Sequence, residues 1–167
     1  HDTTDGVPMR RAKGSYLYSF TEIRCHYINS YYIVLTTIIV IMYQITKAKK
    51  LADKIYLMVV KAPRISANCK PGEFVIVKMD EKGERIPLTI CDYDREKETI
   101  TIVFQEIGAS TIKMSALKEG DSFRDFVGPL GCPSEFVHED IEELKKKKMV
   151  FVAGGVGTAP VYPQVKW

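Results

Sequence analysis

The residues with the clearest chemical potential form a glycine-rich turn near the end of the sequence. The turn, Gly-Gly-Val-Gly-Thr-Ala-Pro at residues 154–160, directly follows an apolar run at residues 149–153. Glycine lets a backbone turn sharply and approach a phosphate closely. Thr158 can cap a following helix, and Pro160 is tolerated in the first turn of that helix. A helix that begins in this way presents free N–H groups to an anion.

Two interpretations of this turn stay open from its residues alone. The turn lacks the Lys-Ser/Thr pair of a P-loop, and Pro160 stands where a Rossmann fingerprint has its third glycine. A plain tight turn therefore explains the pattern as well as a nucleotide site does. The position between a strand of the buried type and a predicted helix favours the nucleotide site.

The cysteines do not indicate a metal site. The sequence has four, and no two of them have the Cys-x-x-Cys spacing of a zinc or iron–sulfur site: Cys25, Cys69, Cys91 and Cys132. A disulfide scaffold would be shorter and richer in cysteine. We therefore expect separate reduced thiols in a cytoplasmic protein, with no metal ligand and no catalytic side chain among them.

Short strands separated by turns precede the glycine-rich turn and would have to position it. Alternating or apolar segments predict about six strands at about ten-residue spacing, at residues 43–51, 55–60, 74–79, 85–91, 98–105 and 122–127. Residues 110–117 predict one short helix, with Ser110 or Thr111 as the N-cap. This pattern predicts an all-β antiparallel barrel or sandwich.

The pattern changes after the closing segment Gly-Pro-Leu-Gly at residues 128–131. Residues 139–145 predict a charged helix with its acids first and its lysines last, as the helix dipole prefers. The lysine run at residues 145–148 indicates a solvated helix end and not a nucleic-acid site. Residues 149–153 predict a buried strand of a parallel sheet. We therefore expect a barrel domain over residues 42–131, a linker with a short charged helix over 132–148, and the beginning of an incomplete α/β nucleotide-binding domain over 149–167.

Composition excludes several classes of protein. The chain has 167 residues, of which 46% are hydrophobic and 27% charged, and its formal net charge is +3. These values exclude a mostly disordered chain, a collagen-like fibre and a multi-span membrane protein. The charge is too small to indicate a nucleic-acid partner by itself.

The segment before the barrel, residues 1–41, allows three interpretations. Residues 27–46 carry no charge, and Arg10, Arg11 and Lys13 precede them, as in a signal-anchor. Polar and β-branched residues in the same stretch suit a packed strand or helix equally well. Alternatively, Met42 is the true start and residues 1–41 are an upstream extension.

Three of the segments together resemble the ferredoxin–NADP reductase superfamily and its small electron-transfer subunits. They are Pro-Leu-Thr at residues 87–89, Gly-Pro-Leu-Gly at 128–131 and the glycine-rich turn at 154–160. The resemblance extends from about residue 43 to the end of the chain, and the glycine-rich turn is its most specific part. It implies a Greek-key barrel that binds FAD, followed by an α/β domain that binds NAD(P)H.

The resemblance assigns flavin contacts to two strands of the barrel. Thr89 would offer its hydroxyl near the reactive ring nitrogen and Leu88 would pack on the ring, with Pro87 beside them. Without the resemblance, these three residues indicate an ordinary buried barrel strand. The next strand would add Val103, Phe104 and Gln105.

The resemblance also assigns phosphate and nucleotide contacts. Ser110 and Thr111 match the pair whose N–H groups face the FAD pyrophosphate, and simple helix capping by the same residues is compatible with that role. The family's pyrophosphate-binding arginine would stand at Ile86, but here the arginine is Arg85. Because a shift of one residue turns a strand side chain to the other face, Arg85 either binds through a local bulge or does not bind. The turn near the nicotinamide and the flavin would use Gly154, Gly155, Val156, Gly157, Thr158 and Pro160.

These assignments predict a function for the chain. We expect an FAD-binding electron-transfer subunit that passes electrons between NAD(P)H and an iron–sulfur or ferredoxin partner, in a hetero-oligomer with a larger flavin/iron–sulfur subunit. A family [2Fe–2S] cluster is expected only beyond Trp167, so the chain is expected to be a fragment with weak or absent NAD(P)H turnover. The alternatives are a cofactor-free barrel that acts as a docking module and a membrane-anchored reductase.

Overall fold

Alternation between apolar and polar side chains sets the faces of the first strands. The computed structural model describes residues 43–167. β1 (Tyr43–Ala52) and β2 (Ile55–Lys61) form an antiparallel hairpin, and β2 also pairs with β5 (Thr99–Gln105). Along β5, Ile100, Ile102 and Phe104 are buried while the residues between them are half-buried, which is the period-two pattern of a strand with one face on a core.

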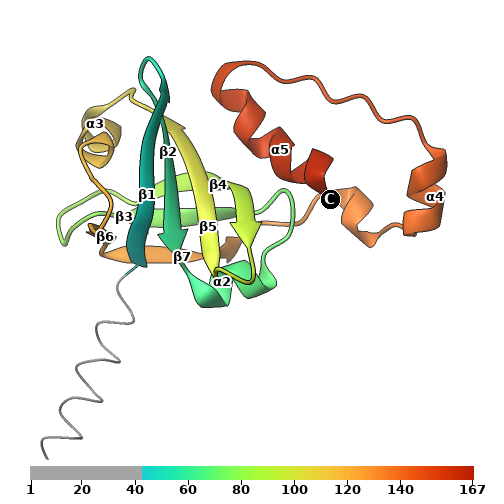
Figure 1. Cartoon of the computed structure of the whole chain (residues 1–167), viewed down its shortest axis with the longest axis horizontal. Helices are drawn as coiled ribbons and strands as arrows, with labels where there is room; N and C mark the ends of the chain where they lie inside the picture. The colour runs from blue at the N-terminus through green and yellow to red at the C-terminus, as the bar shows by residue number, and fades with distance from the viewer. Residues whose placement is uncertain (1–42) are drawn as a thin grey trace, which may run out of the picture. The chain divides into compact units, whose positions relative to one another are not determined.

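The seven strands form one antiparallel sheet in the order β6-β1-β2-β5-β4-β3-β7. The remaining strands are β3 (Phe74–Lys78), β4 (Ile86–Asp94), β6 (Ser122–Phe123) and β7 (Asp125–Leu130). β6 and β7 stand at opposite ends of this order, yet only Arg124 separates them in the chain. The two edges are therefore brought together, and the sheet curls into the nearly closed barrel seen in Figure 1. The predicted all-β antiparallel barrel is confirmed, with the expected strand at residues 122–127 divided in two at Arg124.

The core fills the inside of the barrel. Phe126 of β7 is fully buried, and its ring centroid lies 5.5 Å from that of Tyr43 and 5.8 Å from that of Phe123. Five other strands contribute fully or almost fully buried apolar side chains, and α3 adds Met114; the strand residues include Ile45, Met58, Val60, Val75, Val77, Ile90, Ile100, Ile102 and Phe104. The ends of the sheet are thus joined by packing as well as by chain connectivity.

Within residues 43–167, four short α-helices accompany the strands. They are α2 (Pro63–Asn68), α3 (Ala109–Ser115), α4 (Ile141–Lys146) and α5 (Thr158–Lys166), with 3-10 turns η1 (Glu135–His138) and η2 (Gly155–Gly157). The predicted helices at residues 110–117, 139–145 and after Thr158 are confirmed with small shifts of their ends. No element is predicted from the sequence between the strands at residues 55–60 and 74–79, where α2 lies. Pro63 was an available signal, because proline suits the first position of a helix.

The predicted strand at residues 149–153 is wrong for this structure. These residues adopt no regular structure, and Val150 and Val152 are 85% and 87% exposed. A parallel strand forms only beside a partner strand, and none of the described residues pairs with this run. In Figure 1 it is part of the long connection between α4 and α5.

The first segment, residues 1–41, lies outside the described residues, so its three interpretations stay predictions. Of the uncharged run at residues 27–46, only 43–46 are described, and they begin β1. Within residues 43–167, no helix is both long and apolar enough to cross a membrane.

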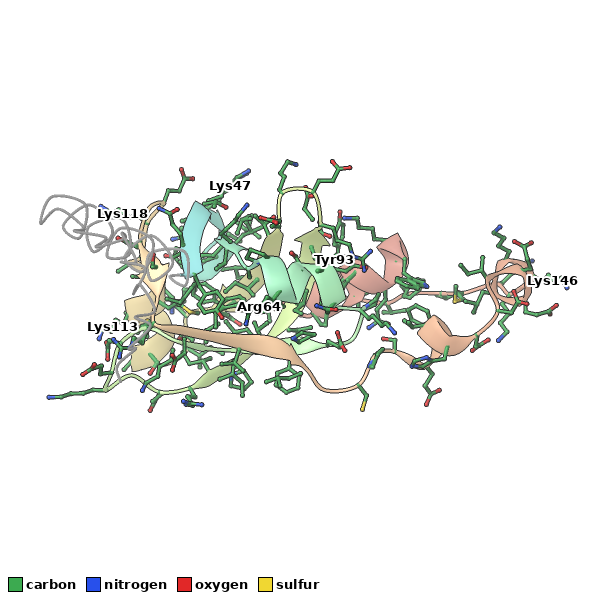
Figure 2. All side chains as sticks on the ribbon, turned by 90° about the horizontal axis from the view of Figure 1, so that it is seen from below. Lys47, Arg64, Tyr93, Lys113, Lys118 and Lys146 are labelled. Atoms are coloured by element: carbon green, nitrogen blue, oxygen red, sulfur yellow. The ribbon has the colours of Figure 1, made fainter. Side chains whose placement is uncertain are left out.

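Charged side chains project from many elements of the described chain. In Figure 2, Lys47 on β1, Lys113 on α3 and Lys118 after α3 lie at one end of the view, whereas Lys146 on α4 lies at the other. Glu143 lies 2.6 Å from the ammonium of Lys146, so part of the lysine run is neutralised within its own helix. This distribution agrees with the interpretation of the run as a solvated helix end.

Candidate functional site

A groove of about 350 Å³ lies where β4, β5 and the start of α5 meet. Because β4 and β5 are antiparallel, the beginning of β4 lies beside the end of β5. The groove brings together most of the residues that the sequence analysis assigned to the flavin: Pro87, Leu88, Thr89, Val103, Phe104, Gln105, Thr111, Val156, Gly157 and Pro160. Residues from three distant parts of the sequence therefore line one site.

The barrel holds the strand walls of the groove firmly in place. Phe104 is almost fully buried, and its ring stacks on Tyr56 with the centroids 5.8 Å apart. Leu88 is half-buried and packs against the same core, and it pairs with Val75 of β3. Because these side chains are already held in one conformation, ligand binding costs little additional side-chain conformational entropy.

The chemical character of the groove is uncharged and mostly apolar. Among the described residues that line it, the polar side chains are Thr89, Gln105 and Thr111, and none carries a formal charge. Such a lining suits a planar, largely apolar group fixed by a few hydrogen bonds. It offers neither a general acid nor a general base, so chemistry at this site would have to come from a bound group.

The glycine-rich turn supplies the third wall and leaves open space beside it. Gly155 has a φ of +55°, in the left-handed region that favours glycine. A Cβ atom added at Gly154 or Gly157 would meet no described atom within 4 Å. Packing within the chain therefore does not explain why these two positions lack side chains, whereas close approach of a ligand would explain it.

A second and larger cavity, of about 620 Å³, lies next to the groove. Val103, Val156 and Ala159 line both spaces. Gly155 and Thr158, two predicted nucleotide contacts, line only this second cavity, and Gly154 lines neither. Its other walls come from the β1–β2 hairpin, from the far end of β4, from Thr101 of β5 and from Tyr162 of α5.

The N-terminus of α3 is organised differently from the expectation. The N-cap is Gly108 and not the predicted Ser110 or Thr111, because the helix already begins at Ala109. The Thr111 hydroxyl accepts hydrogen bonds from the N–H groups of Ile107 at 2.9 Å and Gly108 at 3.1 Å, and it donates to the Gly108 carbonyl at 3.0 Å. Thr111 thus stabilises the start of the helix from its third position while it also lines the groove.

Ser110 and Arg85 do not line the groove. The Ser110 hydroxyl donates to the Glu84 carboxylate, in a separate hollow that also contains Asp80 and Lys113. Arg85 precedes the first residue of β4, and its guanidinium lies 3.7 Å from Asp125. The structure thus places Arg85 in a surface ion pair, and a phosphate contact by either residue stays a prediction.

Two residues that were not predicted from the sequence, Ile107 and Ala159, also line the groove. Ile107 is 82% exposed although it is large and apolar, and it follows the end of β5. Ala159 is buried at the start of α5. The position of Ala159 between two predicted contacts, Thr158 and Pro160, could have indicated that it lines the site. The exposure of Ile107 could not be predicted from the sequence, because it depends on the fold.

The two cysteines buried in the barrel have thiols that resist ionisation. Burial raises the pKa of Cys69 to about 11, although the nearby Arg95 guanidinium opposes the shift. Burial, reinforced by the charge of Asp92, also raises the pKa of Cys91. Among the described residues, no three His, Cys, Asp or Glu side chains gather into a potential metal site.

Comparison with known proteins shows which solved structures this barrel resembles. No family model matches the chain. The solved structure of NADH-dependent reduced ferredoxin-NADP oxidoreductase superposes with a TM-score of 0.55 and 40% identity, over 56% of this chain and 34% of that one. The chain has the ferredoxin reductase-like barrel fold and is similar in sequence to part of that protein.

Sequence relatives narrow the class further. A Thermotoga maritima homologue of the dihydroorotate dehydrogenase B electron-transfer subunit is 40% identical over 123 residues, which are 74% of this chain and 41% of the relative. An uncharacterised Clostridium beijerinckii protein is 64% identical over 126 residues, or 75% of this chain and 43% of that protein. The chain is therefore a homologue of dihydroorotate dehydrogenase B electron-transfer subunits, and it spans less than half the length of these relatives.

Proposed function

We propose that the chain is the FAD-binding part of an electron-transfer flavoprotein subunit. The observation that carries this proposal is the uncharged groove in which β4, β5 and the glycine-rich turn come together. The residues present fit a flavin, because the walls are apolar and rigid and the glycine positions leave space that a Cβ atom would otherwise fill.

Particular residues would hold the flavin in this groove. Leu88 and Val103 would contact the faces of the ring system, and the Thr89 hydroxyl and the Gln105 amide would hydrogen-bond to its polar edge. When bound, FAD supplies the redox chemistry, which includes accepting a hydride and releasing electrons one at a time. The chain's own contribution is to bind the ring, to orient it and to shield it from water.

The names of the relatives support a wider function for the whole protein. We infer that it takes electrons from NAD(P)H and passes them to an iron–sulfur protein, within a complex that contains a larger subunit. The support is the solved NADH-dependent reduced ferredoxin-NADP oxidoreductase and the homology with dihydroorotate dehydrogenase B electron-transfer subunits. Under this proposal the second cavity, beside Gly155 and Thr158, is where a nicotinamide nucleotide would approach the flavin.

Titration with FAD tests the proposal directly. The purified chain is titrated with FAD while flavin fluorescence is followed, and saturable quenching with about one FAD per chain is expected. Thr89→Val keeps the shape and β-propensity of the side chain but removes one hydrogen-bonding group, so FAD should bind about three- to tenfold more weakly.

Thr101→Val is the matched control for this substitution. Thr101 lies on β5, is half-buried like Thr89, and lines the second cavity but not the groove. FAD affinity should therefore be unchanged in this variant. A wild-type chain that shows no quenching would contradict the proposal and support the cofactor-free docking module.

A further inference from the structure

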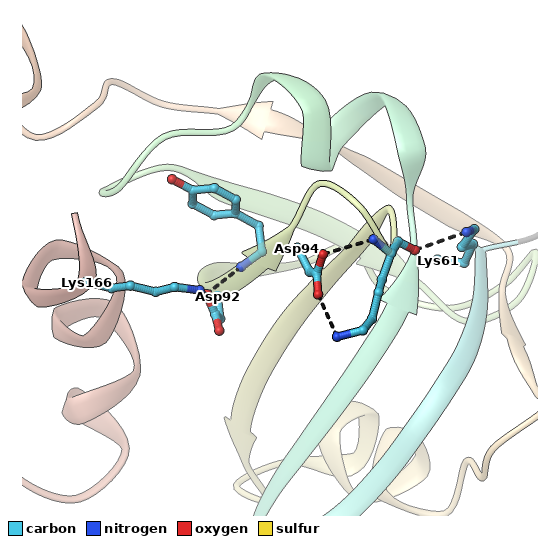
Figure 3. Close-up of polar contacts among 6 residues, drawn as sticks. Lys61, Asp92, Asp94 and Lys166 are labelled. Atoms are coloured by element: carbon cyan, nitrogen blue, oxygen red, sulfur yellow. Dashed lines mark hydrogen bonds and ion pairs between the residues drawn. The ribbon is translucent and has the colours of Figure 1, made fainter.

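Asp92 of β4 holds Lys166 of α5 across 74 positions of sequence. The Lys166 ammonium donates to Asp92 Oδ1 at 2.7 Å, and the backbone N–H of Tyr93 donates to the same oxygen at 2.8 Å (Figure 3). The Tyr93 N–H therefore helps to orient the carboxylate oxygen that also binds the lysine. Among the described residues, no other ion pair connects α5 to the barrel.

An irregularity in β4 sets the position of Asp92. Ile90 pairs with Ile102 of β5, but Asp92 pairs with Thr101, so Cys91 is an additional residue in the ladder. A bulge of this kind bends a strand and changes the direction of the side chains that follow. Figure 3 shows Asp92 directed toward Lys166, whereas Asp94 on the same strand is directed toward Lys97, away from α5.

Lys166 lies on the same face of α5 as the residues that bury it against the barrel. Ala159, Pro163 and Lys166 follow the i, i+4, i+7 spacing of one helix face, and the first two are buried. Ala159 is also a wall of the groove. The helix thus has the groove at its first turn and the Asp92 contact at its last turn.

The Tyr93 ring also contacts the Lys166 ammonium. The Lys166 ammonium lies 6.0 Å from the centroid of the ring, and the Arg95 guanidinium lies 5.0 Å from it. A cation over an aromatic face is attracted by the ring's electron density. Lys166 is therefore held by a carboxylate and an aromatic ring together.

We propose that Asp92 and Lys166 are positioning residues, which hold α5 against β4 so that Val156, Gly157 and Pro160 stay at the groove. The expected effect on ligand binding rests on the proposed function, in which the ligand of the groove is FAD. The contact itself does not depend on any ligand. It can therefore be tested in the flavin-free chain.

Trp167 provides a flavin-free measurement of helix position. It is the only tryptophan in the sequence, and it follows Lys166 at the end of α5. Asp92→Asn removes the charge without changing the size of the side chain. Because the Asp92–Lys166 pair is partly exposed and Trp167 is itself 47% exposed, we expect a modest increase, up to about twofold, in the efficiency with which acrylamide quenches Trp167 in this variant.

Asp94→Asn is the matched control. It makes the same substitution two residues along the chain, where the partner is Lys97 at 2.9 Å and not a residue of α5. Trp167 quenching should equal that of the wild type. The charge-reversed double variant Asp92→Lys with Lys166→Asp should restore quenching to near the wild-type value, which a general loss of packing would not do.

FAD affinity is then measured for the same set of variants. We expect Asp92→Asn to bind FAD about two- to fivefold more weakly, with recovery in the double variant and no change in Asp94→Asn. Equal Trp167 quenching in Asp92→Asn and Asp94→Asn would overturn the positioning role, and so would a change in quenching without a change in FAD affinity. If the wild type binds no FAD, the proposed function fails while the tryptophan measurement still decides whether the pair holds α5.

Discussion

The Arg85 guanidinium lies 3.7 Å from the Asp125 carboxylate and outside the groove that β4, β5 and α5 form. Arg85 precedes β4, so the strand's hydrogen bonds do not direct its side chain toward the groove. A guanidinium that is paired with the Asp125 carboxylate of β7 is less available to a phosphate. The one-residue shift from the family pattern therefore has a structural consequence.

Replacing Arg85 should leave flavin binding almost unchanged. Because Arg85→Met removes only an exposed ion pair, we expect FAD affinity within about twofold of the wild type and a loss of at most about 1 kcal/mol in the free energy of unfolding. Titration of the variant with FAD and urea denaturation measure the two quantities. A tenfold weaker affinity would show that Arg85 reaches the pyrophosphate after all.

Thr111 should matter for the stability of α3. Thr111→Ala removes the hydroxyl that accepts two backbone N–H groups and donates to the Gly108 carbonyl. We expect a loss of about 1 kcal/mol in the free energy of unfolding, within the range known for helix-capping side chains. Thr111→Ser keeps the hydroxyl and should lose clearly less. Similar losses in both variants would mean that the methyl group, and not the hydroxyl, carries the effect.

The strands could be predicted from the sequence because their period is local. Residues 99–105 alternate between core and surface, and any chain with that pattern has one apolar face to bury. The division between β6 and β7 could not be predicted in this way. It arises at Arg124, where the chain passes from one edge of the sheet to the other, and that is a property of barrel closure.

The groove could be predicted only in part. The assignment of its residues depended on the family resemblance, because Pro87, Leu88 and Thr89 alone indicate an ordinary strand. Periodicity does not show that the start of β4 lies beside the end of β5 and under α5. The failed strand at residues 149–153 illustrates the same limit, because a strand depends on partners that its own residues do not specify.

Adjacent residues of β7 should differ strongly in their effect on stability. Phe126 is fully buried between the rings of Tyr43 and Phe123, whereas Val127 is 46% exposed. Because a large cavity would remain in the core, Phe126→Ala should lower the free energy of unfolding by about 3–5 kcal/mol. Val127→Ala should lower it by less than about 1 kcal/mol. Urea denaturation of the two variants checks the difference, and equal losses would contradict the position of the core.

The Cys69 thiol should make the barrel less stable at alkaline pH. Its side chain is fully buried, Sγ donates to the Ser66 carbonyl at 3.8 Å, and burial raises its pKa from 9.0 to about 11. The folded chain therefore holds this proton more tightly than the unfolded chain does. The resulting stabilisation is fully present below pH 9 and is lost as the pH rises from about 9 to about 11.

Urea denaturation across this pH range measures the effect. Between pH 9 and 11 the wild type should lose about 2–3 kcal/mol more of its free energy of unfolding than Cys69→Ala does. Cys69→Ala should be less stable than the wild type at pH 8, because it leaves a small cavity, but its curve should fall less steeply. Cys132→Ala is the control, since that thiol is exposed, and its curve should run parallel to that of the wild type. Parallel curves for the wild type and Cys69→Ala would show that the buried thiol does not ionise on unfolding in this range.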